Sequence, residues 1–406
     1  MAKTILLIGT LDTKGAEYGF VRDLIHARGH QTILMNTAVL HDPTIPPDIS
    51  SSQVAEAGGS SIEALREAGD RGAALTVMGQ GAANLVAKAT AAIQFDGVLA
   101  LGGSGGTSVA TAAMQALPVG LPKVMVSTMA SGDVSPYVDV KDVTMMYSVV
   151  DVAGLNRISR QVFGNAVGAI CGMVEQEIPP ADDKPLIAAT MFGVTTPCVT
   201  AVREKLEAAG YEVLVFHATG SGGRAMEALI EDGFITAVAD LTTTEWCDEL
   251  VGGVLTAGPT RLDAAAQKGV PQVVSLGALD MVNFGGVGSI PNQFKDRNLY
   301  VHNPQVTLMR TTPEECKKLG EIIAKKLNQS AGPTTLFIPL KGISAIATEG
   351  QPFHDPAADQ ALFEAIRQTI DPDKVKLIEL NHAINDPDFA EQVASELLSL
   401  VAKSEK

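Results

Sequence analysis

Short apolar runs of strand length alternate with amphipathic helical stretches along most of this 406-residue chain. Apolar runs without alternating polar positions are typical of strands buried on both faces, and strands that take turns with helices predict parallel βαβ units. In the first part of the chain the expected strands are residues 5–8, 32–35, 75–78, 98–101, 124–127 and 145–150. The expected helices are residues 18–28, 61–69, 82–90, 108–117 and 153–175. This order predicts a doubly wound, mostly parallel sheet.

A proline-rich segment at residues 179–185 interrupts the pattern, which then restarts. The strands expected after it are residues 186–190, 213–216, 237–240, 272–276, 335–339 and 375–379. The helices expected after it are residues 197–209, 223–231, 261–268, 357–369 and 388–399. A chain of 406 residues also exceeds the size at which one core usually stops growing. We therefore expect the α/β fold class in two domains, residues 1–180 and 186–406.

The two halves begin alike. Residues 21–30 align with residues 202–211, and an apolar strand follows each segment. With a three-residue gap, Gly9 aligns with Gly193. An ancient duplication and convergence of a common βαβ pattern both account for this similarity. Asp12 and Lys14 have no counterparts in the second half, so we expect the two halves to differ in chemistry.

Two glycine-rich turns follow expected strands of the first half, GTLDTKG at residues 9–15 and GGSGGT at residues 102–107. The carboxyl ends of parallel strands face one crevice, and free N–H groups at helix starts attract anions such as phosphate. The turns therefore predict a nucleotide or another phosphorylated ligand. Neither turn fits a Walker A or a dinucleotide-binding fingerprint, because a glycine or the lysine is missing. The alternative is that these glycines only let a strand turn tightly into a helix.

The formal net charge of −16 argues against a nucleic-acid partner, because no cluster of Lys and Arg offsets it locally. A polyanion such as ATP would need local help from backbone N–H groups, from Lys14, or from a metal ion. Asp12 is the candidate metal ligand and would hold Mg²⁺ against the phosphates. The alternative is that Asp12 caps a helix and Lys14 is solvated.

The four cysteines are widely separated and form no C-x-x-C pair, which argues against a disulfide framework or a structural zinc site and fits a reducing cytosol. The first apolar run is too short for a signal-peptide core, and no run approaches the ~18 apolar residues of a membrane span. We therefore expect a cytoplasmic protein without a membrane partner.

Five segments carry a family resemblance together: residues 8–15 (IGTLDTKG), 101–107 (LGGSGGT), 126–134 (VSTMASGDV), 275–285 (SLGALDMVNFG), and 342–353 with its GIS and EGQPF motifs. Their combination resembles the ATP-binding domain family of tomato mosaic virus resistance proteins and its bacterial relatives. The resemblance spans nearly the whole chain. It implies two Rossmann-like domains, a homodimer, and ATP binding in the first half.

The ligand-binding residues that the resemblance implies lie in the first three motifs. They are Thr10, Asp12, Thr13, Lys14, Gly103, Ser104, Gly105, Gly106, Thr107, Ser131, Gly132 and Asp133. For residues 131–133 a turn held by the Asp side chain is an equally good explanation. The expected helix at residues 153–175 carries small residues that would allow close packing, either within the fold or against a second subunit.

The second half holds the polar groups most suggestive of catalysis. Its acid–base candidates are Asp240, Glu245, His302 and His354. The two carboxylates follow the expected strand at 237–240, and a histidine exchanges protons near neutral pH. The alternative is that each histidine is an ordinary surface or hydrogen-bonded residue. Cys198, at an expected helix start, is either a stabilised thiolate or a small buried hydrophobe.

Three functions remain open. The leading one is an ATP-binding enzyme that uses the nucleotide, by phosphoryl transfer or ligation, on a small-molecule substrate in the cleft between the domains. The second is a nucleotide-independent hydrolase or carbon–carbon lyase acting on an organic acid. The third is a regulatory binding module that senses a nucleotide.

Overall fold

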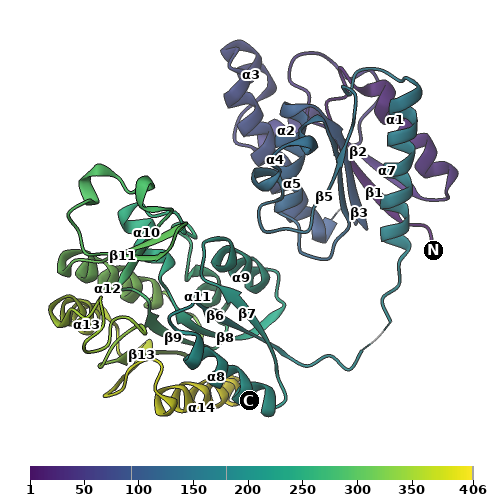
Figure 1. The fold of residues 1–406 in the computed structure, drawn as a ribbon. Helices are drawn as coiled ribbons and strands as arrows, with labels where there is room; N and C mark the ends of the chain where they lie inside the picture. The colour runs from purple at the N-terminus through teal and green to yellow at the C-terminus, as the bar shows by residue number, and fades with distance from the viewer. Residues whose placement is uncertain (93, 180, 405–406) are drawn as a thin grey trace. The chain divides into compact units, whose positions relative to one another are not determined.

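The computed structural model describes residues 1–92, 94–179 and 181–404, which form two compact units (Figure 1). The first unit is Met1–Pro180 and the second is Ala181–Lys406. Both are built on parallel sheets flanked by helices, so the expected α/β, doubly wound, Rossmann-like fold class is confirmed. None of the helices within the described residues is long and apolar enough to cross a membrane.

The sheet of the first unit is parallel and has the order β2-β1-β3-β4-β5. Its strands are β1 (Thr4–Gly9), β2 (Gln31–Asn36), β3 (Gly97–Gly102), β4 (Lys123–Ser127) and β5 (Thr144–Tyr147). The chain passes from β1 outward to β2 and then crosses to β3 on the other side of β1. In doubly wound folds ligands bind where the strand order reverses in this way. That switch point lies here between β1 and β3.

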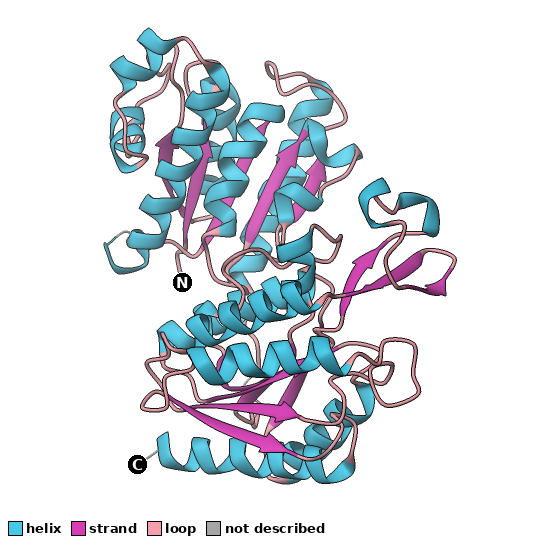
Figure 2. Cartoon of the chain, turned by 90° about the vertical axis from the view of Figure 1, so that its left-hand side faces the viewer, coloured by secondary structure: helices cyan, strands magenta, loops and turns pink. Residues whose placement is uncertain are grey.

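Helices cover both faces of this sheet (Figures 1 and 2). Ile5 and Leu7 of β1 pack on the side of α1 (Gly15–Ala27) and α7 (Arg157–Glu175). Leu6 and Ile8 point to the opposite side, because successive side chains of a strand alternate. The helices of that side are α2 (Ser51–Ala57), α3 (Ile62–Ala68), α4 (Arg71–Ala92) and α5 (Ser104–Gln115). A 3₁₀ turn, η1 (Thr128–Ser131), and the short α6 (Ser135–Val138) follow β4.

The strand expected at residues 75–78 is wrong, because these residues lie inside α4. Ala74, Met78, Ala82 and Val86 are all buried in one core cluster, which is the four-residue spacing of one helix face. A four-residue apolar run is too short for its period to distinguish a strand from a buried helix segment.

The glycines of α7 do not pack closely within the first unit. A Cβ at Gly164, Gly168 or Gly172 would have no heavy atom of the described chain within 4 Å, the helix itself aside. Of the two roles expected for these small residues, packing within the fold is therefore not seen. The homodimer stays a prediction.

The second unit repeats the winding of the first with one more strand. Its parallel sheet has the order β14-β13-β9-β8-β6-β7. The strands are β6 (Leu186–Met191), β7 (Glu212–His217), β8 (Ile235–Thr242), β9 (Gln272–Gly277), β13 (Thr334–Pro339) and β14 (Val375–Leu380). The similar segments 21–30 and 202–211 begin in α1 and α8 (Thr196–Ala208), each the helix after the first strand of its unit. The switch point of this unit lies between β6 and β8.

Two layers of helices enclose this second sheet. The α8 and α14 (Pro387–Ser404) helices cover one face. The helices of the other face are α9 (Ser221–Glu231), α11 (Asp263–Lys268), α12 (Pro313–Leu327) and α13 (Pro356–Thr369), with α10 (Glu245–Val251) packed against α12.

A small antiparallel sheet is inserted between β9 and α12, and the sequence patterns did not predict it. Its order is β10-β12-β11, with β10 (Met281–Phe284), β11 (Leu299–Asn303) and β12 (Val306–Arg310). Two 3₁₀ turns, η2 (Val287–Ser289) and η3 (Asn292–Phe294), join the first two of these strands. Strands this short give a weak periodic signal, since register and partner are set by tertiary contacts.

Candidate functional site

A cavity of about 610 Å³ lies at the switch point of the first unit. Segments that follow all five strands of the sheet contribute to its wall, together with the α3–α4 region. The lining residues are Thr10, Asp12, Thr13, Lys14, Thr37, Ala38, Val39, Leu40, Leu65, Arg66, Gly69, Asp70, Arg71, Ala74, Leu75, Gly103, Ser104, Gly105, Gly106, Thr128, Met129 and Asp151. The two glycine-rich turns therefore face one cavity, as their positions after parallel strands predict.

A buried tyrosine fixes the spacing of the two turns. The Tyr18 hydroxyl accepts a hydrogen bond from the Leu101 N–H at 2.8 Å and lies within donating distance of the Ile8 and Leu101 carbonyls. It thereby joins β1 to β3 next to both turns. Gly9 makes room for the ring, because a Cβ there would lie 2.1 Å from Tyr18 Cζ. Burial raises the pKa of the hydroxyl, which therefore stays protonated as a donor.

The helices that begin at the two turns present uncapped N-termini. Lys14 precedes α1 and Gly103 precedes α5, and neither helix has a side-chain cap. Within the described residues, the first N–H of α5 with an acceptor is that of Thr107, which donates to the Gly103 carbonyl at 2.9 Å. The N–H groups of the preceding residues, Ser104 to Gly106, find no acceptor in the part of the chain that the structure describes. Such donors, together with the helix dipole, form a natural anion site.

Charged side chains of both signs line the same cavity. The Asp12 carboxylate accepts from the Thr13 N–H at 2.7 Å and from the His41 N–H at a long 3.4 Å. The Lys14 ammonium donates to the Val152 carbonyl. These two residues therefore have local partners, but each keeps hydrogen-bonding capacity for a ligand.

Two arginines of the cavity were missed by the sequence analysis. Arg66 donates to the Val39 carbonyl. The side chain of Arg71, the first residue of α4, makes no hydrogen bond or ion pair with the described residues. A Cβ at position 105 would lie 3.5 Å from its Nη2 atom, so Arg71 lies across the glycine-rich turn. No local motif marks either arginine, because only the fold brings α3 and α4 to the turns.

Four residues expected at the ligand do not line the cavity. Thr107 is buried, and its hydroxyl donates to the Gly103 carbonyl at 2.8 Å while lying 2.6 Å from Ser127 Oγ, so it supports the turn from behind. Ser131, the last residue of η1, and the following Gly132 and Asp133 are exposed. The Asp133 carboxylate accepts from the Ser135 N–H at 2.9 Å, in agreement with the turn alternative.

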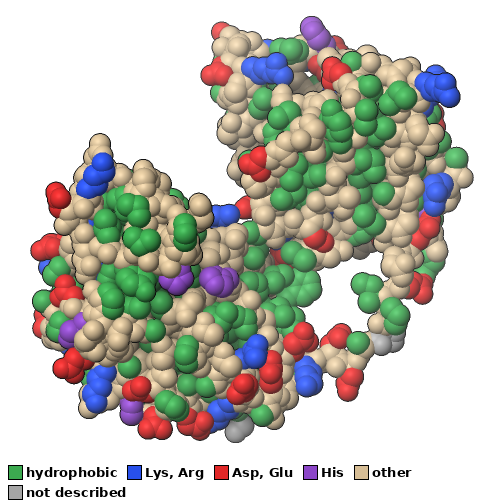
Figure 3. All heavy atoms as spheres, viewed as in Figure 1, with side chains coloured by type: hydrophobic (Ala, Val, Ile, Leu, Met, Phe, Trp, Pro, Cys, Tyr) green, Lys and Arg blue, Asp and Glu red, His purple; other side chains and the backbone are tan. Residues whose placement is uncertain are grey.

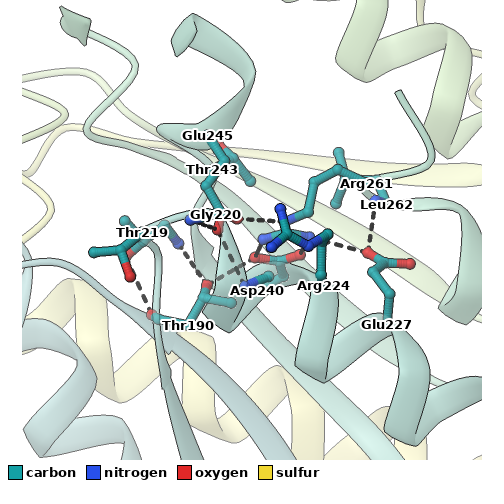
Figure 4. A network of polar contacts seen from close by, with 12 residues as sticks. Thr190, Thr219, Gly220, Arg224, Glu227, Asp240, Thr243, Glu245, Arg261 and Leu262 are labelled. Atoms are coloured by element: carbon teal, nitrogen blue, oxygen red, sulfur yellow. Dashed lines mark hydrogen bonds and ion pairs between the residues drawn. The ribbon is translucent and has the colours of Figure 1, made fainter. Parts of the chain in front are cut away.

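In the second unit, Asp240 and Glu245 belong to a buried ion cluster around Arg261 (Figure 4). Arg261 is 1% exposed, and its Nη2 lies 2.6 Å from Asp240 Oδ1. Its Nε lies 2.7 Å from Glu245 Oε2, and its Nη1 lies 3.2 Å from Glu227 Oε1. Burial by itself lowers the pKa of Arg261, but the charges of Asp240, Glu245 and Glu227 and the hydrogen bonds to Asp240 together outweigh this effect and keep the guanidinium protonated.

The carboxylates of this cluster also cap helices. Glu245 Oε1 accepts from the N–H groups of Gly220 at 2.7 Å and Gly223 at 3.1 Å, at the start of α9. Glu227 accepts from the N–H groups of Leu262 at 2.7 Å and Ala264 at 2.8 Å, at the start of α11. The expected acid–base role of Asp240 and Glu245 is thus at odds with their surroundings, because both are buried and fully engaged in holding the fold.

The remaining catalytic candidates lie apart from this cluster. His302 is exposed on β11, with its ring 6.5 Å from that of Tyr300. His354 lines a second cavity, near β13 and α13. The structure therefore does not assemble the four acid–base candidates into one site. Cys198 is 1% exposed and burial raises its pKa to about 12, which favours the alternative of a small buried hydrophobe.

On the face shown in Figure 3, Lys and Arg side chains stand singly among acidic ones. That face offers no continuous basic surface of the kind that binds a nucleic-acid backbone.

Two family models cover this chain. The N-terminal domain model of the uncharacterised protein family UPF0261 matches residues 3–179, and the C-terminal domain model matches residues 184–401. The chain belongs to the UPF0261 family. Within this UPF0261 chain, the N-terminal match contains the whole cavity of about 610 Å³, and the C-terminal match contains the Arg261 cluster.

Several relatives are similar in sequence to nearly the whole UPF0261 chain. A UPF0261 protein of Clostridium tetani is 53% identical over 404 residues, which are 99% of this chain and 100% of that protein. One of Mesorhizobium japonicum is 48% identical over 394 residues, covering 97% and 98%. The ToMV resistance protein Tm-1(GCR237) of Solanum lycopersicum is 39% identical over 424 residues, covering 98% of this chain and 56% of that protein. The family resemblance drawn from the motifs is confirmed.

Proposed function

We propose that the first unit binds ATP with Mg²⁺ in the cavity at the β1/β3 switch point. The observation that carries this proposal is the convergence of two uncapped helix N-termini, those of α1 and α5, on one cavity that also contains Lys14 and Arg71. Free backbone donors and cationic side chains together suit a phosphate chain. The resemblance of the motifs at 8–15 and 101–107 to an ATP-binding family supports ATP among phosphorylated ligands.

The backbone N–H groups and the cationic side chains would contact the phosphates in different ways. The N–H groups of Ser104 to Gly106 donate hydrogen bonds, and the missing side chain at Gly105 lets a phosphate approach the backbone. Lys14 acts as a mobile point charge, and Arg71 offers a planar pair of donors. These local charges offset the repulsion expected from a chain of net charge −16.

The residues present also fit a magnesium ion and a nucleotide base. The Asp12 carboxylate lines the cavity with capacity left for a hard cation, which prefers oxygen ligands. Val39, Leu40, Leu65 and Met129 supply apolar wall for a base. A cavity of about 610 Å³ is in the usual range for small-molecule and cofactor sites.

The protein then acts as an enzyme that uses ATP on a small metabolite, by phosphoryl transfer or ligation. The nucleotide-independent alternative loses two of its four acid–base candidates, because Asp240 and Glu245 are both engaged by Arg261. A nucleotide-sensing module would bind ATP in the same cavity without consuming it. Nucleotide consumption in a metabolite screen separates the enzyme from the sensor.

The test is calorimetric titration of nucleotide-stripped full-length protein with ATP and Mg²⁺. We expect Arg71→Ala and Lys14→Ala each to weaken binding about tenfold or more, because a charge-assisted hydrogen bond contributes ~1.5–3 kcal/mol. Arg160→Ala, an exposed arginine on α7 outside the cavity, is the matched control and should bind as the wild type does. Absence of wild-type binding, or equal affinity in all three variants, would contradict the proposal.

A further inference from the structure

A second cavity, of about 540 Å³, lies in the second unit where β13 and β14 end. One wall is the segment after β13, with Lys341, Thr348 and Glu349, and the other comes from His354 and the first turn of α13, with Asp359. The loop after β14 adds Asp386. The cavity thus lies at the carboxyl edge of a doubly wound sheet, where such folds bind ligands. It shares no lining residue with the cavity of the first unit.

A buried arginine holds the α13 wall in place from behind. Arg310 of β12 is 3% exposed, and its Nε donates to the Phe353 carbonyl at 2.9 Å. Its Nη2 lies 2.6 Å from Asp359 Oδ1 and 3.4 Å from the Asp355 carbonyl. One side chain therefore fixes both the segment that carries His354 and the carboxylate of Asp359.

A buried aspartate holds the opposite wall. Asp280 is fully buried, and its Oδ2 accepts from the Ser344 hydroxyl at 2.8 Å. Ser344 Oγ in turn accepts from the Ile346 N–H at 3.2 Å, and the Ala345 N–H donates to the Val194 carbonyl at 3.0 Å. The segment between β13 and His354 is thus tied to the body of the unit at several points.

These anchors connect three of the family motifs, residues 275–285, 342–344 and 349–353, which take no part in the nucleotide cavity. Buried charges are costly unless they are paired and hydrogen-bonded, and the positions of their partners are then fixed. Here Arg310 and Asp280 both end on segments that wall the second cavity. The arrangement preorganises that cavity rather than merely filling the core.

The side chains that face this cavity are largely uncommitted. His354 Nδ1 lies 3.2 Å from the Ala347 carbonyl, which can only accept, so the ring proton is on Nδ1 and the neutral ring keeps an acceptor at Nε2. Across the described residues, the Lys341 ammonium, the Glu349 carboxylate and Asp359 Oδ2 have no hydrogen-bond or ion-pair partner. The Asp386 carboxylate is engaged by the Ala383 N–H at 2.8 Å.

The charges define the class of ligand. Lys341 is the one cation among the lining residues described for this cavity, since Arg310 lies behind Asp359 and is paired with it. A dianionic phosphate beside Glu349 and Asp359 would meet like charges. A ligand with one carboxylate and neighbouring hydrogen-bond donors suits this cavity, because the cavity offers one cation and several hydrogen-bond acceptors.

We propose that this cavity binds a small organic acid with hydroxyl or ammonium groups next to its carboxylate. The carboxylate of the ligand pairs with Lys341, and its donors reach Asp359 Oδ2, Glu349 and His354 Nε2. The proposal does not depend on what the first unit binds.

The test measures binding of short organic acids to the full-length protein by ligand-observed NMR. The probes are lactate, glycerate, tartrate, serine and aspartate, with inorganic phosphate as the anion control. We expect at least one of the hydroxy or amino acids to bind saturably, and the successful members of the panel tell whether hydroxyl or ammonium donors are preferred. Lys341→Ala and His354→Ala should each weaken that binding about tenfold, as for a lost charged or polar contact.

Two matched variants serve as controls. Lys317→Ala removes an exposed lysine of α12, and His302→Ala removes an exposed histidine of β11, and both should bind as the wild type does. Arg71→Ala should also leave organic-acid binding unchanged, so a failure of the nucleotide proposal is distinguishable from a failure of this one. A histidine NMR titration gives a second readout, in which the ligand shifts the His354 resonance and leaves that of His302 in place.

Three results would overturn the proposal. They are no saturable binding of any organic acid, unchanged binding in both Lys341→Ala and His354→Ala, or phosphate that binds as well as the acids and displaces them.

Discussion

The two units share a winding order, yet the switch point is open in the first and filled in the second. In the first unit the segments after β1 and β3 border a cavity of about 610 Å³. In the second, Thr195 after β6 and Thr242 at the end of β8 are fully buried, with their hydroxyl oxygens 2.8 Å apart. The start of α8 is also covered, because the Cys198 N–H donates to Asn385 Oδ1 at 3.3 Å.

The difference extends to the helix N-termini. In the first unit the N–H groups at the start of α5 have no acceptor within the described residues, whereas in the second Glu245 caps α9 with a carboxylate of the chain itself. A helix N-terminus attracts an anion in both cases. The two termini follow different strands, α5 after β3 and α9 after β7, but each lies at the carboxyl edge of its sheet. The second unit fills such a terminus with a side chain of its own, whereas the first leaves room for a ligand.

The largest expected effect comes from breaking the Arg261 cluster. Arg261→Met leaves Asp240, Glu245 and Glu227 buried without their cation, which should cost the second unit about 3–5 kcal/mol of unfolding free energy. Denaturant unfolding of the full chain measures it, with Arg367→Met as control, because the Arg367–Glu379 pair is more exposed and contributes at most ~1 kcal/mol. Equal losses in the two variants would show that the cluster is not a structural centre.

The second effect is a pH dependence of stability that comes from two buried aspartates of the second unit. Burial raises the pKa of Asp280 to about 6 and that of Asp248 to about 6, so the folded state binds these protons more tightly than the unfolded chain. Stability from these groups is therefore greatest below about pH 4 and falls as pH rises toward 6, by up to ~3 kcal/mol for each.

Asp280→Asn should remove its share of that slope. The replacement keeps an acceptor for Ser344 and places the amide nitrogen where Asp280 Oδ1 has no partner in the described part of the chain. Unfolding free energies measured between pH 4 and 7 test the prediction, and an unchanged slope in the variant would contradict it.

A pair of glycines, one in the first turn of α5 and one in that of α9, distinguishes the open helix N-terminus from the filled one. A Cβ at Gly223 would lie 2.2 Å from Glu245 Oε2, in a rigid network, so Gly223→Ala should destabilise the second unit by about 1–3 kcal/mol. A Cβ at Gly105 would lie 3.3 Å from the flexible end of Leu75, so Gly105→Ala should leave unfolding nearly unchanged and weaken ATP binding instead. Thermal unfolding and calorimetry of both variants show whether the effects separate in this way.

The smallest effect concerns the link between the central strands of the first unit. Tyr18→Phe removes the acceptor of the buried Leu101 N–H and should cost about 1–2 kcal/mol. Faster amide exchange at Leu101, relative to buried amides of β4, would report the loss.

In the second unit Thr190 has the matching role, since its hydroxyl accepts from the Thr242 N–H at 2.9 Å and joins β6 to β8. Thr190→Val should therefore give a similar loss there.

Much of the fold could be predicted from the sequence because strand and helix signals are local. The expected strands at 5–8, 98–101 and 237–240 all lie inside observed strands. The run at 75–78 was misassigned because four mostly apolar residues fit a strand and a buried helix segment equally well. Its helical face shows only over the longer span from Ala74 to Val86. The inserted sheet β10-β12-β11 was missed because its register depends on contacts across the unit.

The candidate site, too, depends partly on local sequence signals and partly on tertiary contacts. The sequence by itself determined that two glycine-rich turns end parallel strands and so face one crevice, since turn residues and strand direction are encoded locally. Only the tertiary structure decided which groups join them there. It brought Arg71 to the first crevice and sent Arg261 to Asp240 and Glu245 in the second. A helix N-terminus stays free for a ligand only if no charged side chain from elsewhere in the chain reaches it. Glu245 fills the N-terminus of α9 in this way, and it is buried there with Arg261.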